Sequence, residues 1–346
     1  MPGHEKLPRL CFVGPLLGCN PGWVTSQGEI LADLLTQEGY SIYSTSTFPN
    51  RVLRLLDTIS SLIAWRREID IVILMVFSGP SFGIVDIASQ VTKWIRKPLV
   101  LWLHGGNIPT FTENHLHWVQ RVLHRGDVLV SPSPYLANYI SGLGYEAEVI
   151  PNVLEIDRYQ YVHRQHVQPR LLWMRTFEDI YNPEMAVEVL AQLRSKYPKA
   201  RLSMAGQDRG LLDSVKKIAE GNGLSGHVRF PGYLNMDGKQ KEFVNHDIFI
   251  NTNRVDNMPV SVVEAAAFGL PIVATSVGGI PYLLSNEQTG LLVEDEDVGG
   301  MVKAVTRLIE EPELASTLSV NGRHLAESCA WSHVKPQWEK IFNELE

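Results

Sequence analysis

Two acidic side chains, eight positions apart, have surroundings that suit the binding of a sugar-bearing anion. Asp256 stands just before a predicted helix over residues 259–268, and Glu264 lies inside that helix among small and apolar residues. A carboxylate near a packed face needs hydrogen-bond partners. Both vicinal hydroxyls of a ribose can donate to one carboxylate, and the free N–H groups at a helix start can bind phosphate or sugar oxygens. The diglycine Gly278-Gly279 after the next predicted strand would supply further free N–H groups. The run therefore predicts a nucleotide-sugar site, although Glu264 read alone could equally be a structural glutamate.

A second candidate is Arg175, which directly follows the predicted strand 171–174. A guanidinium at a strand end suits a phosphate or diphosphate, because it offers paired, charged hydrogen bonds. The alternative is a surface salt bridge from Arg175 to Glu178 or Asp179. Arg209, after another predicted strand, is a weaker candidate for the same role.

Two glycine-rich loops follow strands in the first half of the chain. His104 stands at the end of the predicted strand 99–103 and before two glycines, which would let a ligand approach its ring. Residues 14–22 open a helix after the first strand, where N–H groups can meet an anion. This loop is not G-x-G-x-x-G, and no acidic residue ends the second strand, which argues against a nicotinamide or flavin cofactor. The alternatives are a structural histidine and a turn whose glycines serve backbone geometry.

These loops need strands and helices to position them, and the apolar pattern predicts both. Short apolar runs alternate with helix-length amphipathic segments, which indicates an α/β chain with parallel sheets covered on both faces. The pattern restarts near residue 170, so we expect two doubly wound halves joined by a linker over 154–169. Strands are predicted at 10–13, 41–44, 71–77, 99–103, 128–130, 147–150, 171–174, 201–205, 227–230, 248–250 and 271–275. Helices are predicted at 25–37, 52–66, 82–94, 114–124, 183–197, 211–221, 239–244, 259–268 and 299–310.

Composition excludes several classes of protein. The 346 residues include 31 Lys+Arg and 38 Asp+Glu, and a net charge of −7 argues against binding nucleic acid. Three scattered cysteines argue against a disulfide framework or a zinc site and fit a reducing cytoplasm. The longest apolar run, residues 71–77, is too short to cross a bilayer, and the N-terminus shows no signal peptide.

Positive charge is relatively concentrated in the first half of the chain. It is either an ordinary solvated surface or a weakly basic face toward an anionic acceptor or a membrane. The residues concerned are Arg51, Arg54, Arg66, Arg67, Lys93, Arg96 and Lys97.

The chain resembles the retaining glycosyltransferases of family four, which have the GT-B fold. The likeness extends over nearly the whole chain and is strongest between Leu171 and Pro312. The family signature is a Glu-x7-Glu motif, a helix of small residues, a Gly-x-Pro-apolar-Val-Ala-Thr stretch and a Gly-Gly turn. Here these are Asp256-x7-Glu264, Ala265–Thr275 and Gly278-Gly279, and residues 228–232, 246–250 and 287–293 also match the family pattern.

The resemblance implies a role for each matching position. Glu264 would hold the donor's ribose, Asp256 would contact hydroxyls of the transferred sugar, and Arg175 would bind the diphosphate. His104 would lie by the transferred sugar as a third catalytic residue with Arg175 and Asp256, and Gly18 would approach the donor. The other donor-binding positions would be Arg209, Asn257, Met258, Val260, Ser261, Gly278 and Gly279.

The chain departs from the family pattern at three places. The first glutamate is Asp256, which is one methylene shorter. The usual glycine–aromatic–glycine is Asn257-Met258-Pro259, and Pro259 has no N–H to donate. Asn182 replaces a lysine, and the loss of this positive charge implies a different donor or diphosphate geometry, compensation by Arg209, or weak activity.

The resemblance also implies an overall architecture and activity. Two Rossmann-like domains, 1–160 and 168–329, would face each other across a cleft, with the C-terminal segment 330–346 packing back on the first. The enzyme would move a hexose-type sugar from a UDP- or GDP-sugar to an acceptor hydroxyl, with retention, without a metal or other cofactor, in polysaccharide or glycoconjugate synthesis. The acceptor would be a carbohydrate or lipid-linked molecule, contacted by loops around 48–56 and 107–114.

We expect a cytoplasmic protein with at most peripheral contact to the inner face of a membrane. Two alternatives to a transferase remain open. One is a nucleotide-sugar epimerase or a phosphorylase-like enzyme of the same fold. The other is a catalytically silent protein that binds nucleotide sugars, which the altered Asp256 motif and the missing lysine suggest.

Overall fold

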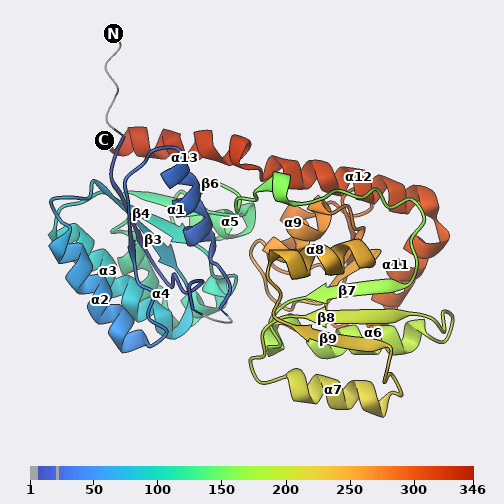
Figure 1. Cartoon of the computed structure of the whole chain (residues 1–346). Coiled ribbons are helices and arrows are strands. Elements are labelled where there is room, and N and C mark those ends of the chain that lie inside the picture. The colour runs from blue at the N-terminus through green and yellow to red at the C-terminus, as the bar shows by residue number, and fades with distance from the viewer. Residues whose placement is uncertain (1–6, 21–22) are drawn as a thin grey trace, which may run out of the picture. The chain divides into compact units, whose positions relative to one another are not determined.

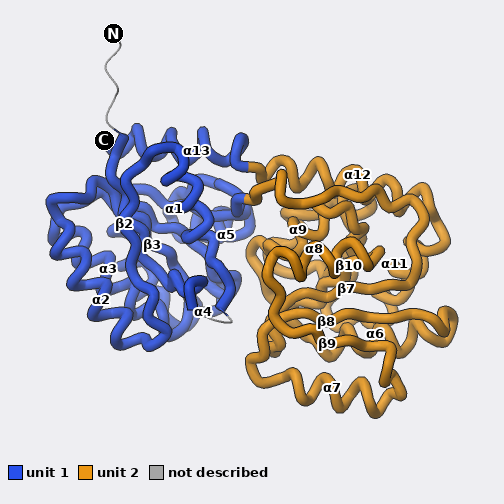
Figure 2. Tube along the Cα trace, in the orientation of Figure 1, with its two compact units in different colours: residues 1–153, 331–346 blue, residues 154–330 orange. Residues whose placement is uncertain are grey.

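The chain forms two compact units in the computed structural model, which describes residues 7–20 and 23–346. Unit 1 comprises residues 1–153 and 331–346, and unit 2 comprises residues 154–330 (Figure 2). Pro21 and Gly22 of the predicted anion-binding loop lie outside the described residues. None of the helices in the described ranges is both long and apolar enough to span a bilayer.

The segment 154–169, predicted to be a linker, packs into unit 2. The Leu154 amide donates a hydrogen bond of 2.8 Å to the Cys329 carbonyl. The buried Arg164 guanidinium donates to the Phe243 carbonyl at 2.9 Å. The segment is therefore tied to unit 2 by main-chain and buried side-chain bonds, because its polar residues find partners there rather than in water.

Unit 1 is built on a parallel sheet with the strand order β2-β1-β3-β4-β5-β6 (Figure 1). Helices α1 and α13 pack on one face and helices α2 to α5 on the other, so the central strands are apolar throughout. The strands are β1 (Leu10–Val13), β2 (Ile42–Thr45), β3 (Ile71–Val76), β4 (Leu99–Leu103), β5 (Val128–Ser131) and β6 (Glu148–Val149). The helices are α1 (Gln27–Gln37), α2 (Arg51–Ala64), α3 (Phe82–Trp94), α4 (Ile108–Leu123), α5 (Pro134–Gly142) and α13 (Trp331–Leu345).

Unit 2 is built on a second parallel sheet with the order β12-β11-β10-β7-β8-β9. Helices α6, α7 and α11 cover one face, and α8, α9 and α10 cover the other. The strands are β7 (Arg170–Met174), β8 (Arg201–Ala205), β9 (Val228–Gly232), β10 (Ile248–Asn251), β11 (Ile272–Thr275) and β12 (Leu291–Val293). The helices are α6 (Pro183–Leu193), α7 (Leu212–Gly221), α8 (Met236–Asn245), α9 (Val260–Ala267), α10 (Ile280–Leu283), α11 (Val298–Glu310) and α12 (Pro312–Ser328).

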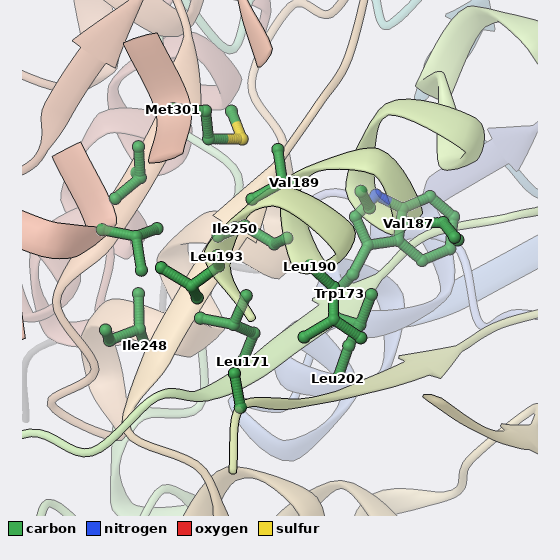
Figure 3. Packing of buried hydrophobic residues seen from close by; sticks show 14 of the residues in the cluster. Leu171, Trp173, Val187, Val189, Leu190, Leu193, Leu202, Ile248, Ile250 and Met301 are labelled. Carbon is green, nitrogen blue, oxygen red and sulfur yellow. The ribbon is translucent and has the colours of Figure 1, made fainter. Parts of the chain in front are cut away.

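Strand β7 shows how the sequence builds the core of unit 2. Leu171 and Trp173 point to the cluster under α6 and α11, whereas Leu172 and Met174 belong to the cluster under α9. Figure 3 shows Trp173 packed among the apolar side chains of the first cluster. Its indole N–H donates to Thr252 Oγ1 at 2.9 Å, so the one polar atom of this large side chain is satisfied.

The structure differs from the predicted elements at several helix starts. Helices α5, α10, α12 and α13 and strand β12 have no counterpart among the predicted elements. Helices α5 and α12 begin with a proline, which also reads as a loop residue. Helix α4 begins at Ile108 rather than at residue 114, with a kink at His115. The predicted acceptor loops 107–114 and 48–56 are therefore largely helical, since α2 begins at Arg51.

Candidate functional site

The strand order of unit 2 reverses between β7 and β10. These strands are neighbours in the sheet, although β8 and β9 separate them in the sequence. The loop after β7 leads to α6 on one face, and the loop after β10 leads to α9 on the other. Ligands of open α/β sheets bind at such a point, beyond the carboxyl ends of the strands. The loops after β7 and β10 carry Arg175 and Asp256.

Arg175 and Asp256 form an ion pair at this reversal point, with one guanidinium nitrogen bonded to Asp256 Oδ2. The same oxygen accepts from Asn253 Nδ2 at 2.6 Å, and Oδ1 accepts from the Asn257 amide at 2.8 Å. The Arg175 guanidinium also lies over the Tyr181 ring, 4.3 Å from its centroid. Arg175 is thus paired with Asp256 rather than with Glu178 or Asp179, the partners considered from the sequence.

Three polar atoms around this pair are buried without a hydrogen-bond partner among the described residues. They are Arg175 Nε, Asn253 Oδ1 and the hydroxyl of Ser261, the second residue of α9. Buried polar groups in native proteins are nearly always paired, so unpaired ones need an explanation. A polar ligand that reaches the end of β10 would offer hydrogen-bond partners to the Arg175 Nε donor, the Asn253 Oδ1 acceptor and the Ser261 hydroxyl.

The diglycine turn packs against the backbone of the Asp256 loop. The Gly279 amide donates to the Asp256 carbonyl at 2.9 Å. A Cβ atom on Gly278 or Gly279 would overlap with the carbonyl oxygen of Asp256 or Asn257, and Gly278 also has a φ of 53°. The two glycines are therefore required for the close approach of two loops, because any side chain would separate them. The prediction that this turn offers free N–H groups is wrong for Gly279.

Glu264 is buried on α9 and makes two hydrogen bonds through one oxygen. Its Oε1 accepts from Lys239 Nζ at 2.7 Å and from the Tyr159 hydroxyl at 3.1 Å. Neither bond uses Oε2, so this oxygen keeps its capacity to accept. Burial raises the pKa of Tyr159, and the charge and hydrogen bond of Glu264 raise it further.

The other predicted donor-binding residues of unit 2 lie along the same loops. Val260 and Ser261 open α9 after Pro259, and no side chain caps this helix start. Asn257 is buried, and Met258 packs into the cluster under α9. Arg209 is exposed and donates to Gln207 Oε1 at 3.4 Å, so it is not part of the pair at the reversal point.

Asn182, at the position of the family lysine, caps a helix. Its side-chain oxygen accepts from the Met185 amide at 3.4 Å, and it adopts a left-handed conformation with φ 43°. Asparagine suits both tasks, because it tolerates this region and is a strong N-cap. Its side chain supplies neither the charge nor the reach of a lysine.

Two predicted site residues, Gly18 and His104, belong to unit 1. The Gly18 amide donates to Glu29 Oε1 at 2.8 Å, and Glu29 closes a capping box with Ser26 at the start of α1. The His104 ring stacks on Phe77, with ring centroids 5.4 Å apart, and its Nε2 is buried without a partner among the described residues. Burial lowers the pKa of His104 to about 3, so the ring is neutral at neutral pH.

Three contacts of the site were not predicted from the sequence. Lys239 was assigned only to a helix, Tyr159 lay in the predicted linker, and Asn253 was not assigned a role. Their partners are 25, 105 and 3 positions away in the sequence, respectively. Only for Asn253 does the spacing offer a signal, since Asx side chains often bond near neighbours. Within the described ranges, no group of three His, Cys, Asp or Glu side chains is arranged to hold a metal ion.

Comparisons with known proteins show which protein families this chain resembles. Residues 162–325 match the family model of glycosyl transferases group 1. A curated relative, the GDP-mannose-dependent alpha-(1-6)-phosphatidylinositol monomannoside mannosyltransferase of Mycolicibacterium smegmatis, is 28% identical over 150 residues, which cover 41% of this chain and 39% of that protein. The matches to the curated relatives span 31 to 63% of their lengths.

Two solved structures show the same fold over the full chain. Sucrose-phosphate synthase from Thermosynechococcus elongatus is 16% identical with a TM-score of 0.81, over 98% of this chain and 99% of that one. HepE of Anabaena, solved with UDP and glucose, is 16% identical with a TM-score of 0.78, over 98% and 100%. The chain thus has the GT-B fold, and residues 162–325, which carry the site at the β7–β10 reversal, match the model of the glycosyl transferases group 1 family.

Proposed function

We propose that this chain is a retaining glycosyltransferase that moves a hexose-type sugar from a nucleoside-diphosphate sugar to an acceptor hydroxyl. The observation that carries the proposal is the Arg175–Asp256 pair, with unpaired buried polar atoms beside it, at the strand reversal of a group 1 glycosyltransferase domain. A cation, a carboxylate and a helix start together suit a ligand that has both phosphates and hydroxyls.

The diphosphate binds to Arg175 in this proposal. The guanidinium would exchange Asp256 for phosphate oxygens, and Arg175 Nε would gain the partner that it lacks within the described residues. The released Asp256 carboxylate would accept hydrogen bonds from hydroxyls of the transferred sugar. On donor binding, Arg175 and Asp256 would thus exchange their mutual contact for contacts with the diphosphate and with the transferred sugar, respectively.

The ribose of the donor binds to Glu264 Oε2. Lys239 and Tyr159 hold Oε1 and fix the carboxylate's orientation. Such an oriented, buried acceptor suits a pair of vicinal hydroxyls better than a flexible surface glutamate would, because less side-chain entropy is lost on binding. The first N–H groups of α9 remain for phosphate or sugar oxygens.

The chemistry follows from the charges that develop on transfer. The leaving diphosphate gains negative charge, and Arg175 would stabilise it. We propose that no metal is needed, that retention follows a front-face path in which the leaving phosphate helps to accept the acceptor's proton, and that the nucleotide sugar is the co-substrate. The roles of His104, Gly18 and Arg209 stay predictions.

The relatives suggest the chemical class of the donor and the acceptor. The mycobacterial relative is named for GDP-mannose and a phosphatidylinositol mannoside, and HepE was solved with UDP and glucose. We therefore propose a UDP- or GDP-sugar as donor and a carbohydrate or a lipid-linked molecule as acceptor, in glycoconjugate or polysaccharide synthesis.

A thermal-shift and calorimetric screen of UDP-, GDP- and ADP-sugars against the full chain tests this proposal. One donor class should raise the melting temperature, and incubation with it should release the nucleoside diphosphate slowly even without an acceptor. Conversion of the donor to an epimer would make the chain an epimerase, and binding without turnover would make it a silent binding protein. A failure of all donors to bind would overturn the proposal.

A further inference from the structure

The first turns of helix α2 in unit 1 differ from those of an ordinary surface helix, although further along the helix Leu62 is buried in the core. Ordinary surface helices bury their apolar stripe and expose polar residues. Here Arg54 and Thr58 are buried, and the Arg54 guanidinium donates to the Phe48 carbonyl at 2.9 Å. The outward side of the first turns instead carries Val52, Leu53 and Leu56, of which 66, 49 and 58% are exposed.

The neighbouring helix α3 extends this apolar exposure. Helices α2 and α3 both pack on the face of the sheet opposite α1 and lie side by side in Figure 1. On α3, Ile87 and Trp94 are exposed, seven positions apart, which places them on one side of the helix. Trp94 is 67% exposed. An exposed tryptophan next to charged residues is typical of side chains that insert at a membrane interface.

Basic side chains flank these apolar residues. Segments 51–67 and 82–97 contain seven basic residues and two acidic ones, in a chain whose net charge is −7. Both acidic side chains have partners. Asp57 accepts a hydrogen bond from the Thr45 hydroxyl at 2.9 Å. Asp86 forms ion pairs with Arg121 in α4 and with Arg125, which follows α4. Among the described residues, six of the seven basic side chains have no ion-pair partner. Arg54 is buried, and the other five are not: Arg51, Arg66, Arg67, Arg96 and Lys97.

The direction of the two helices gathers much of this charge at one edge. Both follow parallel strands of one sheet, so they run in the same direction and their C-terminal ends lie at the same edge. Arg66 and Arg67 follow α2 there, Trp94 ends α3, and Arg96 and Lys97 follow α3. The combination of exposed apolar side chains with unpaired cations is the one that binds amphipathic surfaces to anionic lipids.

We propose that the outward face of α2 and α3 docks on an anionic lipid bilayer. A second copy of the chain is a poorer occupant, because self-association would bring the same uncompensated positive charges face to face. The inference goes beyond the proposed function, and it does not depend on which donor the site in unit 2 binds. A lipid-linked acceptor would be presented at such a surface.

Sedimentation of the full chain with vesicles tests the inference. The protein should bind vesicles of phosphatidylcholine with phosphatidylglycerol, bind vesicles of phosphatidylcholine alone far more weakly, and be released by salt. Reversal of two charges in Arg66→Glu/Arg67→Glu should weaken binding by at least about tenfold, given a contribution of about fivefold for each basic residue. Leu56→Ser/Trp94→Ser should also weaken it at constant charge.

Matched variants in unit 2 serve as controls. Lys199→Glu/Lys217→Glu changes the net charge by the same amount at two exposed positions. Tyr233→Ser/Val244→Ser removes two exposed apolar side chains. Both should bind vesicles like the unaltered chain, and circular dichroism checks that every variant is folded. Equal loss in the controls, or equal binding to neutral vesicles, would overturn the inference. So would a dimer in light scattering that Leu56→Ser/Trp94→Ser converts to a monomer, since the face would then be an interface between copies.

Discussion

Arg175 and Lys239 each bind a carboxylate of the site, Asp256 and Glu264 respectively. A diphosphate that binds Arg175 must therefore compete with Asp256. The measured affinity is the difference between the free energies of the two interactions. In the free protein, the ion pair with Asp256 keeps the partly buried Arg175 from being left without a counter-charge. Substitution of Arg175 and of Glu264 should therefore affect binding of the diphosphate and of the ribose differently.

Replacement of Arg175 by alanine should weaken binding of UDP or GDP by about tenfold to a hundredfold, because hydrogen bonds to charged groups contribute about 1.5–3 kcal/mol. Binding of the bare nucleoside should change little. Titration calorimetry with both ligands measures the effect, and Arg201→Ala is the control, since Arg201 is exposed at the start of β8, at the opposite end of the parallel strands from Arg175. If nucleoside and nucleotide lost affinity equally, Arg175 would have a structural role through Asp256.

Replacement of Glu264 by glutamine should weaken nucleoside and nucleoside diphosphate alike. Both carry the ribose, and a neutral amide is a weaker acceptor for its hydroxyls, with a loss of at least about tenfold. Lys239→Met separates this effect from damage to the buried pair, because it removes the lysine but keeps the carboxylate. A smaller loss is expected in Lys239→Met, because the Tyr159 hydroxyl still holds Oε1. Near-native affinity in Glu264→Gln would contradict the assignment of Glu264 to the ribose.

His104 should make the stability of unit 1 depend on pH. Its pKa is lowered to about 3 by burial, whereas the unfolded residue titrates near 6.5. Between these values the unfolded chain binds one more proton than the folded chain, so the free energy of unfolding falls by about 1.4 kcal/mol for each pH unit of acidification.

Urea unfolding of the unaltered chain and of His104→Phe measures this dependence. Phenylalanine keeps the stacking on Phe77 and removes the titration. Between about pH 7 and about pH 5, the unaltered chain should lose about 2 kcal/mol more than the variant. Equal losses would show that the His104 ring is protonated in the folded protein.

The residue types of the site could be predicted from the sequence, but several of their partners could not. Asp256, Arg175 and Glu264 were identified from strand ends and a helix start, which local patterns reveal. Tyr159 reaches Glu264 across 105 positions, and no periodicity encodes such a contact. Asn182 shows a different limit. The replacement of the family's lysine was visible in the sequence, but the role of Asn182 as a helix cap became clear only from its left-handed backbone.

At the scale of elements, the turn between β11 and α10 fixes the Asp256 loop. Gly279→Ala would place a methyl group on the Asn257 carbonyl, so the turn and the loop must move apart. We expect a loss of about 3 kcal/mol or more in the free energy of unfolding, as for other overpacked buried sites. Donor binding should fall with it.

Gly299→Ala is the matched control for that prediction. Gly299 lies in the first turn of α11, where a Cβ atom would be 3.7 Å from Asp297 Oδ1, an ordinary contact. The same substitution should therefore be neutral or stabilise the protein by up to about 1 kcal/mol, the difference in helix propensity between the residues. Chemical denaturation of both variants compares them. A comparable loss at both positions would mean that the close approach at Gly279 is not what requires glycine.

Strands were predicted more closely than helix starts. The predicted strands 99–103 and 201–205 match β4 and β8 without change. Residues 99–103 form an uninterrupted apolar run, which is typical of a strand buried on both faces. The starts of α4, α5 and α12 were missed or displaced, and each has a proline within its first two positions. Proline indicates either a loop or a helix start, and only the tertiary contacts decide between them.

For the molecule as a whole, the chain completes unit 1 with its last helix. It leaves this unit at residue 153 and returns at residue 331, after the whole of unit 2. Helix α13 then buries Val334, Trp338, Ile341 and Phe342 in the same cluster as β1 and α1. The family resemblance implied that the C-terminal segment would pack on the first domain. The physical reason is the apolar stripe of α13, which is removed from water when the helix packs on that face of the sheet.

Two tryptophans of unit 1 test this dependence on the chain's end. Trp338 is 1% exposed and its ring meets Trp102 edge to face, with centroids 5.0 Å apart, whereas Trp94 is 67% exposed. Trp338→Ala should therefore lower the free energy of unfolding by about 3–5 kcal/mol, and Trp94→Ala by less than about 1 kcal/mol. Limited proteolysis locates the damage: cleavage in Trp338→Ala should begin within residues 7–153 while a fragment near 154–330 persists. First cleavage in unit 2, or equal losses in the two variants, would contradict the assignment of α13 to the core of unit 1.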